Sequence, residues 1–350
     1  MLARATRRQP ITHLVVTIAV FACSKPKAPA PRDAPAAAAP DAAPAPVDAT
    51  SGGITIRFKD KPAPGSTLAR RCVLGGDPLA SDCVGGGVSL ARGADGRFYV
   101  VAGKQVRRYQ RVPGADCRLE PSGAPIELPA EKSRPQELGK GPVYMRSGGP
   151  AWHLVRAGTA LYAFDFLGGM VRIDRGKPEL ACDVFGYRSA AALGKRMLVA
   201  RHGIEELRLG THCKAASARI DDKARGDVYV VGDQLFVANG SDVTRYDDKT
   251  PVALGGDTKP CYVSSMTACG DGACAVDSNC KQVIQYGHDG KVLRTLDDDQ
   301  LFESMPWSLH DAVTTEGGDV LLLARHRDTT NGKEICEAAI YELPAAVFTL

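Results

Sequence analysis

The sequence lacks the common catalytic motifs. It has no G-x-S-x-G nucleophile elbow, no H-E-x-x-H zinc helix and no phosphate-binding P-loop. The three acids at residues 297–299 lack the alternating spacing of a calcium loop, so we expect a solvated loop between repeats there. These absences exclude the enzyme classes that carry such motifs. They do not exclude enzymes that gather catalytic residues from separate repeats.

The chain also lacks a long apolar run and an excess of one charge. The apolar run at residues 11–22 is too short for a membrane span, which takes about 20 residues. The formal net charge is +4, and it falls to +1 when residues 1–22, which hold three arginines and no acid, are removed. Without a strong basic stripe, neither nucleic acid nor anionic lipid is expected as a principal partner.

The first 23 residues have the layout of a secretory signal, because arginines precede the apolar run and Cys23 follows it. Residues 20–23, Val-Phe-Ala-Cys, resemble the lipobox of bacterial lipoproteins, whose cysteine is acylated and becomes the mature N-terminus. The resemblance implies an exported protein anchored to the cell envelope through lipidated Cys23. Ser24 fits sorting to the outer membrane, facing the periplasm or the surface. An ordinary cleaved signal with a chance cysteine is the alternative.

Three parts are predicted along the chain: a lipoprotein-type signal peptide at residues 1–22, a linker at 23–50 and a folded domain at 51–350. From residue 24 to 48 the linker is almost entirely Ala, Pro and Asp, which cannot bury enough apolar surface to fold. Pro-rich segments extend by about 3 Å per residue. We therefore expect a disordered tether that holds the folded domain away from a membrane.

Eleven cysteines are present, and ten remain after Cys23. An even number in an exported chain favours disulfides. We expect a local pair between Cys72 and Cys83, and a bridge across a hairpin within the densest group. That group consists of Cys261, Cys269, Cys274 and Cys280. Because it has no C-x₂-C knuckle, zinc is the weaker alternative and no metal site is predicted.

Paired strands recur along the last two thirds of the chain. Short apolar runs begin at residues 97, 160, 196, 234, 273 and 319, and most are followed by a strand with alternating apolar and polar residues. Repeats of roughly 40 residues with several strands each are typical of propeller blades. The sequence therefore predicts an all-β fold, a six-bladed β-propeller, with a degenerate seventh blade at residues 143–146 left open. A lone alternating strand at residues 54–59 is expected to close the ring.

The clearest copy of the repeat spans residues 226–247. Its apolar run at residues 234–238 is typical of a strand covered on both faces. Asn239-Gly240 then predicts a type I′ turn, because both residue types tolerate positive φ. Trp152 and Trp307 stand at the starts of repeats, and we expect both to pack in the core.

One repeat resembles a known family. Residues 272–296 are similar to an NHL repeat, in which Asp follows an apolar strand and an aliphatic, an aromatic and an Asp-Gly turn come later. The matching positions are Val276, Asp277, Val283, Tyr286, Asp289 and Gly290. Cys280 and Gln282 replace the usual Asn and Arg. The resemblance implies a six-bladed propeller, a scaffold that binds protein, glycan or RNA and that, in related propellers, carries lactone hydrolysis or lyase chemistry.

Polar residues follow the apolar runs at corresponding positions, which in a propeller face one end of the molecule. The triplet Ala-Arg-His occurs at residues 200–202 and 324–326, three blades apart and hence across the axis, where two guanidinium groups suit an anionic ligand. The candidate binding residues are Asp165, Arg201, His202, Asp277, Arg325 and His326. The alternative, which we favour, is that they satisfy hairpin turns and neighbouring backbone groups.

The sequence thus favours a lipid-anchored extracytoplasmic propeller that acts as a binding or scaffolding module in the cell envelope. Its expected partners are the membrane, through Cys23, and an unidentified protein, glycan or small anionic ligand, with no nucleic acid and no cofactor. A second hypothesis, less favoured, is a propeller hydrolase or lyase that uses axial residues such as Asp165, Asp277, His202 and His326 with a divalent metal. A third is an accessory lipoprotein of envelope protein assembly.

Overall fold

The computed structural model describes residues 67–349 apart from short gaps. The gaps are residues 77, 82–87, 115, 130–151, 166–168, 183–187, 201–202, 209–213, 248–249, 305 and 331–332. The expected signal, tether, closing strand at 54–59 and seventh blade at 143–146 all lie outside the described residues. The chain divides into two units, residues 1–50 and 51–350, and every described residue belongs to the second.

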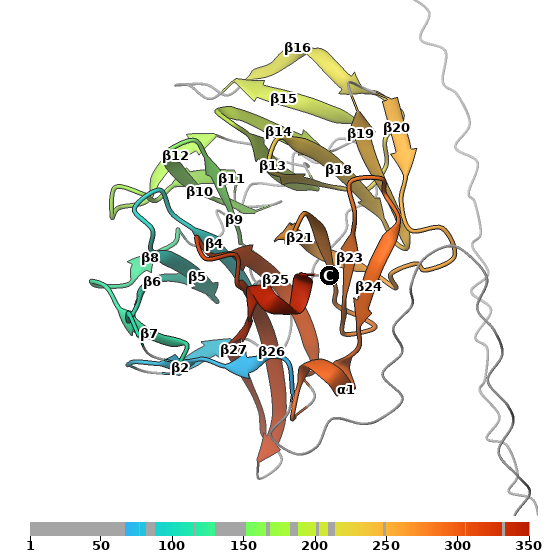
Figure 1. Cartoon of the computed structure of the whole chain (residues 1–350). Helices are drawn as coiled ribbons and strands as arrows, with labels where there is room; N and C mark the ends of the chain where they lie inside the picture. The colour runs from blue at the N-terminus through green and yellow to red at the C-terminus, as the bar shows by residue number, and fades with distance from the viewer. Residues whose placement is uncertain are drawn as a thin grey trace, which may run out of the picture. The chain divides into compact units, whose positions relative to one another are not determined.

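Six mainly antiparallel sheets form the blades of a propeller (Figure 1). Blade 1 contains β4 (Val88–Arg92), β5 (Phe98–Ala102), β6 (Gln105–Arg111) and β7 (Arg118–Pro121), with β8 (Ile126–Glu127) beside β6. Blade 2 contains β9 (His153–Ala157), β10 (Ala160–Asp165), β11 (Gly169–Arg172) and β12 (Glu179–Cys182). Blade 3 contains β13 (Ser189–Leu193), β14 (Arg196–Ala200), β15 (Ile204–Arg208) and β16 (Lys214–Asp221).

The second half of the ring repeats this order. Blade 4 contains β17 (Asp227–Val231), β18 (Gln234–Asn239), β19 (Asp242–Asp247) and β20 (Thr250–Ala253). Blade 5 contains β21 (Val263–Cys269), β22 (Gly272–Asp277), β23 (Gln282–Tyr286) and β24 (Val292–Leu296). Blade 6 contains β25 (Ser308–Thr314), β26 (Val320–Thr330) and β27 (Lys333–Leu343). The prediction of an all-β, six-bladed propeller is confirmed.

The predicted apolar runs are the second strands of the blades. Strands β10 and β22 are buried from their second residue to their last, because each blade is covered on both faces by its neighbours. The third strands β6 and β19 instead mix buried residues with partly or fully exposed ones, whereas β23 is buried after its first residue. The predicted pair of a covered strand and a half-exposed strand is therefore confirmed in blades 1 and 4 and is wrong in blade 5.

The core is divided among the interfaces between blades. Each of six hydrophobic clusters combines buried side chains from two neighbouring blades, and the sixth joins blade 6 to blade 1. Trp152, which is fully buried, belongs to the cluster between blades 1 and 2, as expected. The innermost strands contact one another in a closed cycle: β4, β9, β13, β17, β21, β25 and again β4.

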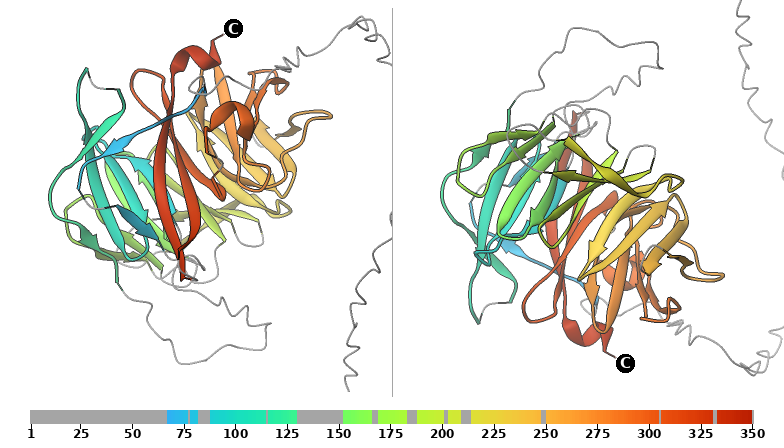
Figure 2. Two further views of the ribbon diagram at one scale, coloured as in Figure 1. Left: turned by 90° about the horizontal axis from the view of Figure 1, so that it is seen from below. Right: turned by 90° about the horizontal axis from the view of Figure 1, so that it is seen from above.

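The segment before blade 1 closes this ring. Strand β1 (Arg70–Arg71) pairs with β27 of blade 6, and β2 (Val73–Leu74) then runs parallel to β7 of blade 1. Strand β3 (Leu79–Ser81) also pairs with β27. Figure 2 shows this blue segment passing between the red and teal blades. Closure by the N-terminal side was expected, but among the described residues β1 and β3 provide it.

One of the disulfides also joins the closing segment to blade 1. Cys72 is bonded to Cys117 in blade 1, so the predicted pair with Cys83 is wrong. Each cysteine directly precedes one of the paired strands β2 and β7. Because Val73 N–H donates to the Cys117 carbonyl at 2.9 Å, Cys117 lies beside Cys72. The dense group forms two bridges, Cys261–Cys280 and Cys269–Cys274, and the second crosses the β21–β22 hairpin as expected.

Two local expectations are corrected. The loop between β18 and β19 is Gly240-Ser241, with Asn239 paired to Asp242, so the turn lies one residue later than predicted. Only Gly240 has positive φ, at 62°, which fits a turn with glycine first rather than type I′. Residues 297–299 are not an open loop: Asp297 caps the short helix α1 (Asp298–Leu301), because acids suit a helix N-terminus.

The described part of the chain contains little helix. Besides α1 there is one 3₁₀ turn, η1 (Ala345–Phe348), which follows β27. No helix among the described residues is long and apolar enough to cross a membrane.

Candidate functional site

An axial cavity of about 1300 Å³ lies inside the ring of innermost strands. All six of these strands contribute to its wall, and most of the wall is made of small or aliphatic residues such as Ala190, Val155 and Met266. Polar and aromatic side chains gather where the innermost strands begin. We call this end the polar mouth, which is lined by His153, Arg188, Asp227, Tyr262, Trp307, Ser308, His310 and Arg325.

A half-buried carboxylate joins three of the innermost strands across the cavity wall. One Asp311 oxygen accepts from the Ser89 hydroxyl at 2.6 Å and from Leu90 N–H at 2.8 Å. The other accepts from the Ser265 hydroxyl at 2.6 Å and from Ala312 N–H at 2.8 Å. Burial raises the pKa of Asp311, although these four hydrogen bonds act to lower it. Asp311 therefore ties blade 6 to blades 1 and 5.

Hydroxyl groups extend this belt around the ring. The Ser89 oxygen accepts from Leu154 N–H at 2.9 Å, which links blade 1 to blade 2. The Ser189 oxygen accepts from Val228 N–H at 2.8 Å and links blade 3 to blade 4. The belt satisfies backbone groups that the innermost strands cannot pair within their own sheets. Together with Asp311 it links the innermost strands of blades 5, 6, 1 and 2, and separately those of blades 3 and 4.

Trp307 is placed beside two arginines at the polar mouth. Its backbone N–H donates to the Arg325 carbonyl at 2.8 Å, which fixes the residue directly before β25 against β26. Its ring centroid lies 6.0 Å from the Arg325 guanidinium carbon and 5.2 Å from that of Arg327. The side chain is 44% exposed. The expectation that Trp307 packs in the core is wrong, because it precedes an innermost strand that borders the cavity rather than a blade interface.

His310 and Ser308 lie on the same strand. The His310 Nε2 atom is 2.7 Å from the Ser308 hydroxyl. Burial, and then the positive charges of Arg325 and His153, lower the pKa of His310 to about 3. His310 is therefore neutral at ordinary pH, mainly because burial disfavours its charged form.

An ion pair between Arg188 and Asp227 lies on the other blades of the mouth, away from Trp307 and Arg325. Arg188 Nε lies 2.9 Å from Asp227, and the Tyr262 hydroxyl is 3.4 Å from the same carboxylate. Burial raises the pKa of Asp227, while Arg188 acts to lower it. Burial and the Asp227 charge raise the pKa of Tyr262. The Tyr262 ring is 38% exposed, so it offers a second aromatic surface.

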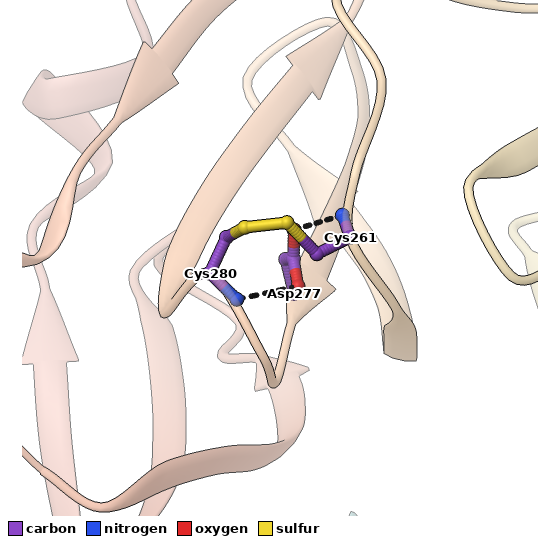
Figure 3. Close-up of side chains that lie close together, drawn as sticks. All are labelled: Cys261, Asp277 and Cys280. Atoms are coloured by element: carbon purple, nitrogen blue, oxygen red, sulfur yellow. Dashed lines mark hydrogen bonds between the residues drawn. A yellow bond between two sulfur atoms is a disulfide. The ribbon is translucent and has the colours of Figure 1, made fainter. Parts of the chain in front are cut away.

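Asp277 holds the segment that carries Tyr262 (Figure 3). Its carboxylate accepts from the backbone N–H groups of Cys261, Tyr262, Asn279 and Cys280 at 2.6 to 3.1 Å, and from the Gln282 amide at 2.9 Å. Cys261, Asp277 and Cys280 also form the one group of metal-ligand type among the described residues. Because the two sulfurs are joined and the carboxylate is occupied by five donors, the group is a structural clamp rather than a cation site.

The structure separates the predicted binding residues. Asp277 and Arg325 pair with Val263 and Ser308, the first residues of innermost strands. Asp165 directly follows Phe164, which pairs with His153 at the start of β9, so all three lie at the mouth end of their blades. Of the described candidates, only Arg325 lines the axial cavity. His326 points the other way along β26, and its Nε2 is 2.7 Å from the Tyr341 hydroxyl. Arg201 and His202 lie outside the described residues.

The residues missed by the sequence reasoning stand on the first strand of each blade. The prediction placed the axis at the ends of the buried apolar runs, which are the second strands. The signal was present one hairpin earlier, where a charged or aromatic residue opens a short mixed strand, as at His153, Asp227 and Trp307. The composition of such strands gives only a weak strand signal, because the side that faces the cavity carries polar as well as apolar residues.

These features define a six-bladed β-propeller with an axial cavity open at a polar, aromatic mouth. No family model matches the chain, and no curated protein matches its sequence. Solved structures that are similar to it include the nidogen/laminin complex, at 13% identity over 65% of this chain and 83% of that chain, with a TM-score of 0.42. Apo AztD from Citrobacter koseri is similar at 11% identity over 79% and 88%, with a TM-score of 0.40. Glutaminyl cyclase from Myxococcus xanthus is similar at 10% identity over 79% and 96%, with a TM-score of 0.34.

Proposed function

We propose that this chain is an exported, lipid-anchored propeller that binds a small ligand at the polar mouth of its axial cavity. The observation that carries the proposal is the cavity itself, which six blades enclose and whose mouth combines aromatic, cationic and hydroxyl groups. Ligand sites are typically concave, largely apolar and provided with a few convergent polar groups. The belt around Asp311 supports this role, because it holds the wall in place before any ligand arrives.

The anchor is proposed from the sequence. The arginine-rich start, the apolar run and Cys23 support acylation at the envelope, and the Ala/Pro-rich segment at residues 24–48 supports a tether. The NHL-like pattern of residues 272–296 supports a propeller of the binding kind. On this proposal the domain presents its mouth to ligands at a distance from the membrane.

Catalysis is the weaker proposal. The hydrolase or lyase hypothesis places Asp165, Asp277, His202 and His326 at the axis. Asp165 and Asp277 are buried outside the lining of the axial cavity, and His326 contacts Tyr341. Asp277 accepts five hydrogen bonds from neighbouring groups, which supports a structural role for this residue. The described candidates thus do not form an acid and base pair at the cavity.

A thermal-shift screen of the full chain tests binding at the mouth. The probes are monosaccharides, amino acids and organic acids, each added up to millimolar concentration. We expect at least one saturable rise in Tm that Trp307→Ala abolishes, because the exposed ring contacts the ligand. The control, Arg196→Gln, changes an exposed arginine paired with Glu206 on β14 and β15 and should leave the shift intact. No saturable response to any probe would overturn the proposal.

Metabolic labelling with an alkyne fatty acid tests the anchor in a bacterial host. The native chain should be labelled and recovered with membranes. Cys23→Ser should be unlabelled and released, whereas Cys72→Ser, which keeps Cys23, should still be labelled. A label that persists in Cys23→Ser would contradict lipidation at that position.

A further inference from the structure

Exposed aromatic rings are concentrated at the polar mouth. Among the described residues, the large hydrophobic side chains that stand exposed are Val73, Tyr262, Trp307 and Ile335. Both aromatic members of this set, Tyr262 and Trp307, line the axial cavity. Large aromatic side chains are usually kept from water in a folded protein, so two of them at one concave site indicate a surface that is covered by a ligand.

Positive charge lies against one of these rings. Arg325 and Arg327 are within 6.0 Å of the Trp307 centroid, and Arg325 is only 4% exposed. Arg188 lies at the same mouth. A guanidinium group binds carboxylate or phosphate with two parallel hydrogen bonds, and a buried one does so with little competition from water.

Small polar groups complete the mouth. Ser278, Asn279 and Ser308 line it, and the Tyr262 hydroxyl and the Asp227 carboxylate lie between them and Arg188. Hydroxyl, amide and carboxylate groups together both donate and accept hydrogen bonds. Asp227, Tyr262 and Ser308 already have partners within the protein. Their oxygens can each take part in a further hydrogen bond, so a ring that carries hydroxyls finds more partners at the mouth than a purely aromatic acid does.

We propose that the polar mouth binds an acidic sugar, whose ring stacks on Trp307 and whose anionic group is bound by the arginines beside it. This inference rests on the proposed function, since it names the ligand class of the same site. Carboxylate and phosphate share the required chemistry, so a uronic acid and a sugar phosphate are its two possible sources. With a volume of about 1300 Å³ the cavity admits the end of an oligosaccharide as well as a single sugar.

The two tryptophans of the chain make the charge at the mouth measurable. Trp152 is fully buried and Trp307 is exposed, so dissolved quenchers reach mainly Trp307. We expect iodide to quench the emission at least twofold more effectively than caesium at equal ionic strength. Trp307→Phe, which leaves only Trp152, should remove the difference. Equal quenching by the two ions in the native chain would overturn the anionic part of the proposal.

Titration of Trp307 fluorescence then tests the ligand class. Glucuronate and glucose 6-phosphate supply a ring with a charge, glucose supplies the ring alone, and acetate and inorganic phosphate supply the charge alone. We expect one or both charged sugars to bind at least tenfold more tightly than any other probe. The stronger of the two identifies the carboxylate or the phosphate as the natural group.

Variants connect binding to the named residues. Arg327→Gln, on an exposed arginine paired with Glu334, should weaken the charged sugar at least threefold without loss of folding. Arg325→Gln should weaken it more, and circular dichroism checks that this buried change leaves the fold intact. Arg196→Gln should change nothing. Binding of glucose as tight as that of the stronger charged sugar, or no effect of either Arg325→Gln or Arg327→Gln, would overturn the inference.

The two levels of the proposal fail separately. If neutral sugars or amino acids raise the Tm through Trp307 while charged sugars do not bind, the mouth is a ligand site and the acidic-sugar inference is wrong. If no probe of any kind responds, the proposed function itself is wrong. The same native chain serves both tests.

Discussion

His310 gives the polar mouth a measurable pH dependence. Its pKa is lowered from 6.5 to about 3, chiefly by burial. In the unfolded chain a histidine takes up a proton near pH 6.5, whereas the folded His310 does not until about pH 3. The unfolded state therefore binds more protons in this range, and stability falls as pH drops from 6.5 toward 3.

Replacing His310 by Gln should remove this contribution. Between pH 7.5 and pH 5 the free energy of unfolding of the native chain should fall by about 2 kcal/mol more than that of His310→Gln. Urea denaturation at the two pH values measures both. His288→Gln, at an exposed position, is the matched control and should keep the native pH dependence. Identical losses in the native chain and in His310→Gln would contradict a buried neutral histidine.

Asp311 is the second residue whose environment makes a sharp prediction. In Asp311→Asn, whichever way the amide is turned, its nitrogen meets a backbone N–H, that of Leu90 or that of Ala312. One buried donor is then left facing another donor. We expect a loss of about 2 kcal/mol in denaturant unfolding. Asp271→Asn, at an exposed turn, should cost little, and equal stability of the two variants would refute the role given to Asp311.

Only part of the site could be predicted at the scale of single residues. Arg325 was found because its strand end lies opposite Ser308, close to the axis. Asp277 was a candidate because of its position in the repeat. Its carboxylate instead accepts five hydrogen bonds, most of them from backbone N–H groups of the adjacent turn and segment. Trp307 was assigned to the core because large aromatic residues usually lie there. Whether the residue that opens the first strand of a blade borders the axial cavity or packs against the neighbouring blade depends on the tertiary structure.

At the scale of elements, the Asp277 clamp connects the β22 to β23 turn to the segment that enters β21. Asp277→Ala should free Tyr262 at the mouth, because four backbone N–H groups lose their acceptor. Hydrogen exchange at residues 261–262 and 279–280 should accelerate at least tenfold, and stability should fall by about 3 kcal/mol. The control is Asp289→Ala, whose carboxylate accepts from Lys291 N–H in an exposed turn of the same blade. Exchange that changes equally in both variants would contradict the clamp.

The elements themselves were largely predictable. A strand that is buried on both faces has a nearly continuous apolar run, so all six second strands could be located from composition alone. The first strands could not, because β9 and β25 mix apolar residues with His, Arg and Asp. The short strands β1 and β2 have two residues each and leave no periodic pattern to detect.

At the scale of the whole molecule, stability depends on how the ring is closed. Arg70 of β1 and Arg111 of blade 1 both pair with Glu342 of β27, a residue with no exposed surface. Cys72–Cys117 adds a covalent link between the closing segment and blade 1. Blade 6 therefore depends on a segment from the opposite end of the domain.

The contribution of each disulfide to the free energy of unfolding should depend on the length of the loop that it closes. Cys72–Cys117 spans 45 residues and Cys269–Cys274 only 5. From loop entropy, replacing the first pair by alanines should cost about 4 kcal/mol and the second about 2 kcal/mol. All four cysteines are buried, so the packing changes are comparable. Guanidinium denaturation of the two double variants measures the difference, and a larger loss for the shorter loop would contradict it.

The pairing of β1 with β27 also determines when the ring can close during synthesis of the chain. Arg70 and Glu342 are 272 residues apart, and a ribosome adds about 5 to 20 residues per second. The first strand to emerge therefore waits on the order of tens of seconds for its partner. Throughout that time blade 1 has no neighbour on the side of blade 6, and the apolar side chains that it later buries against β26 and β27 stay uncovered.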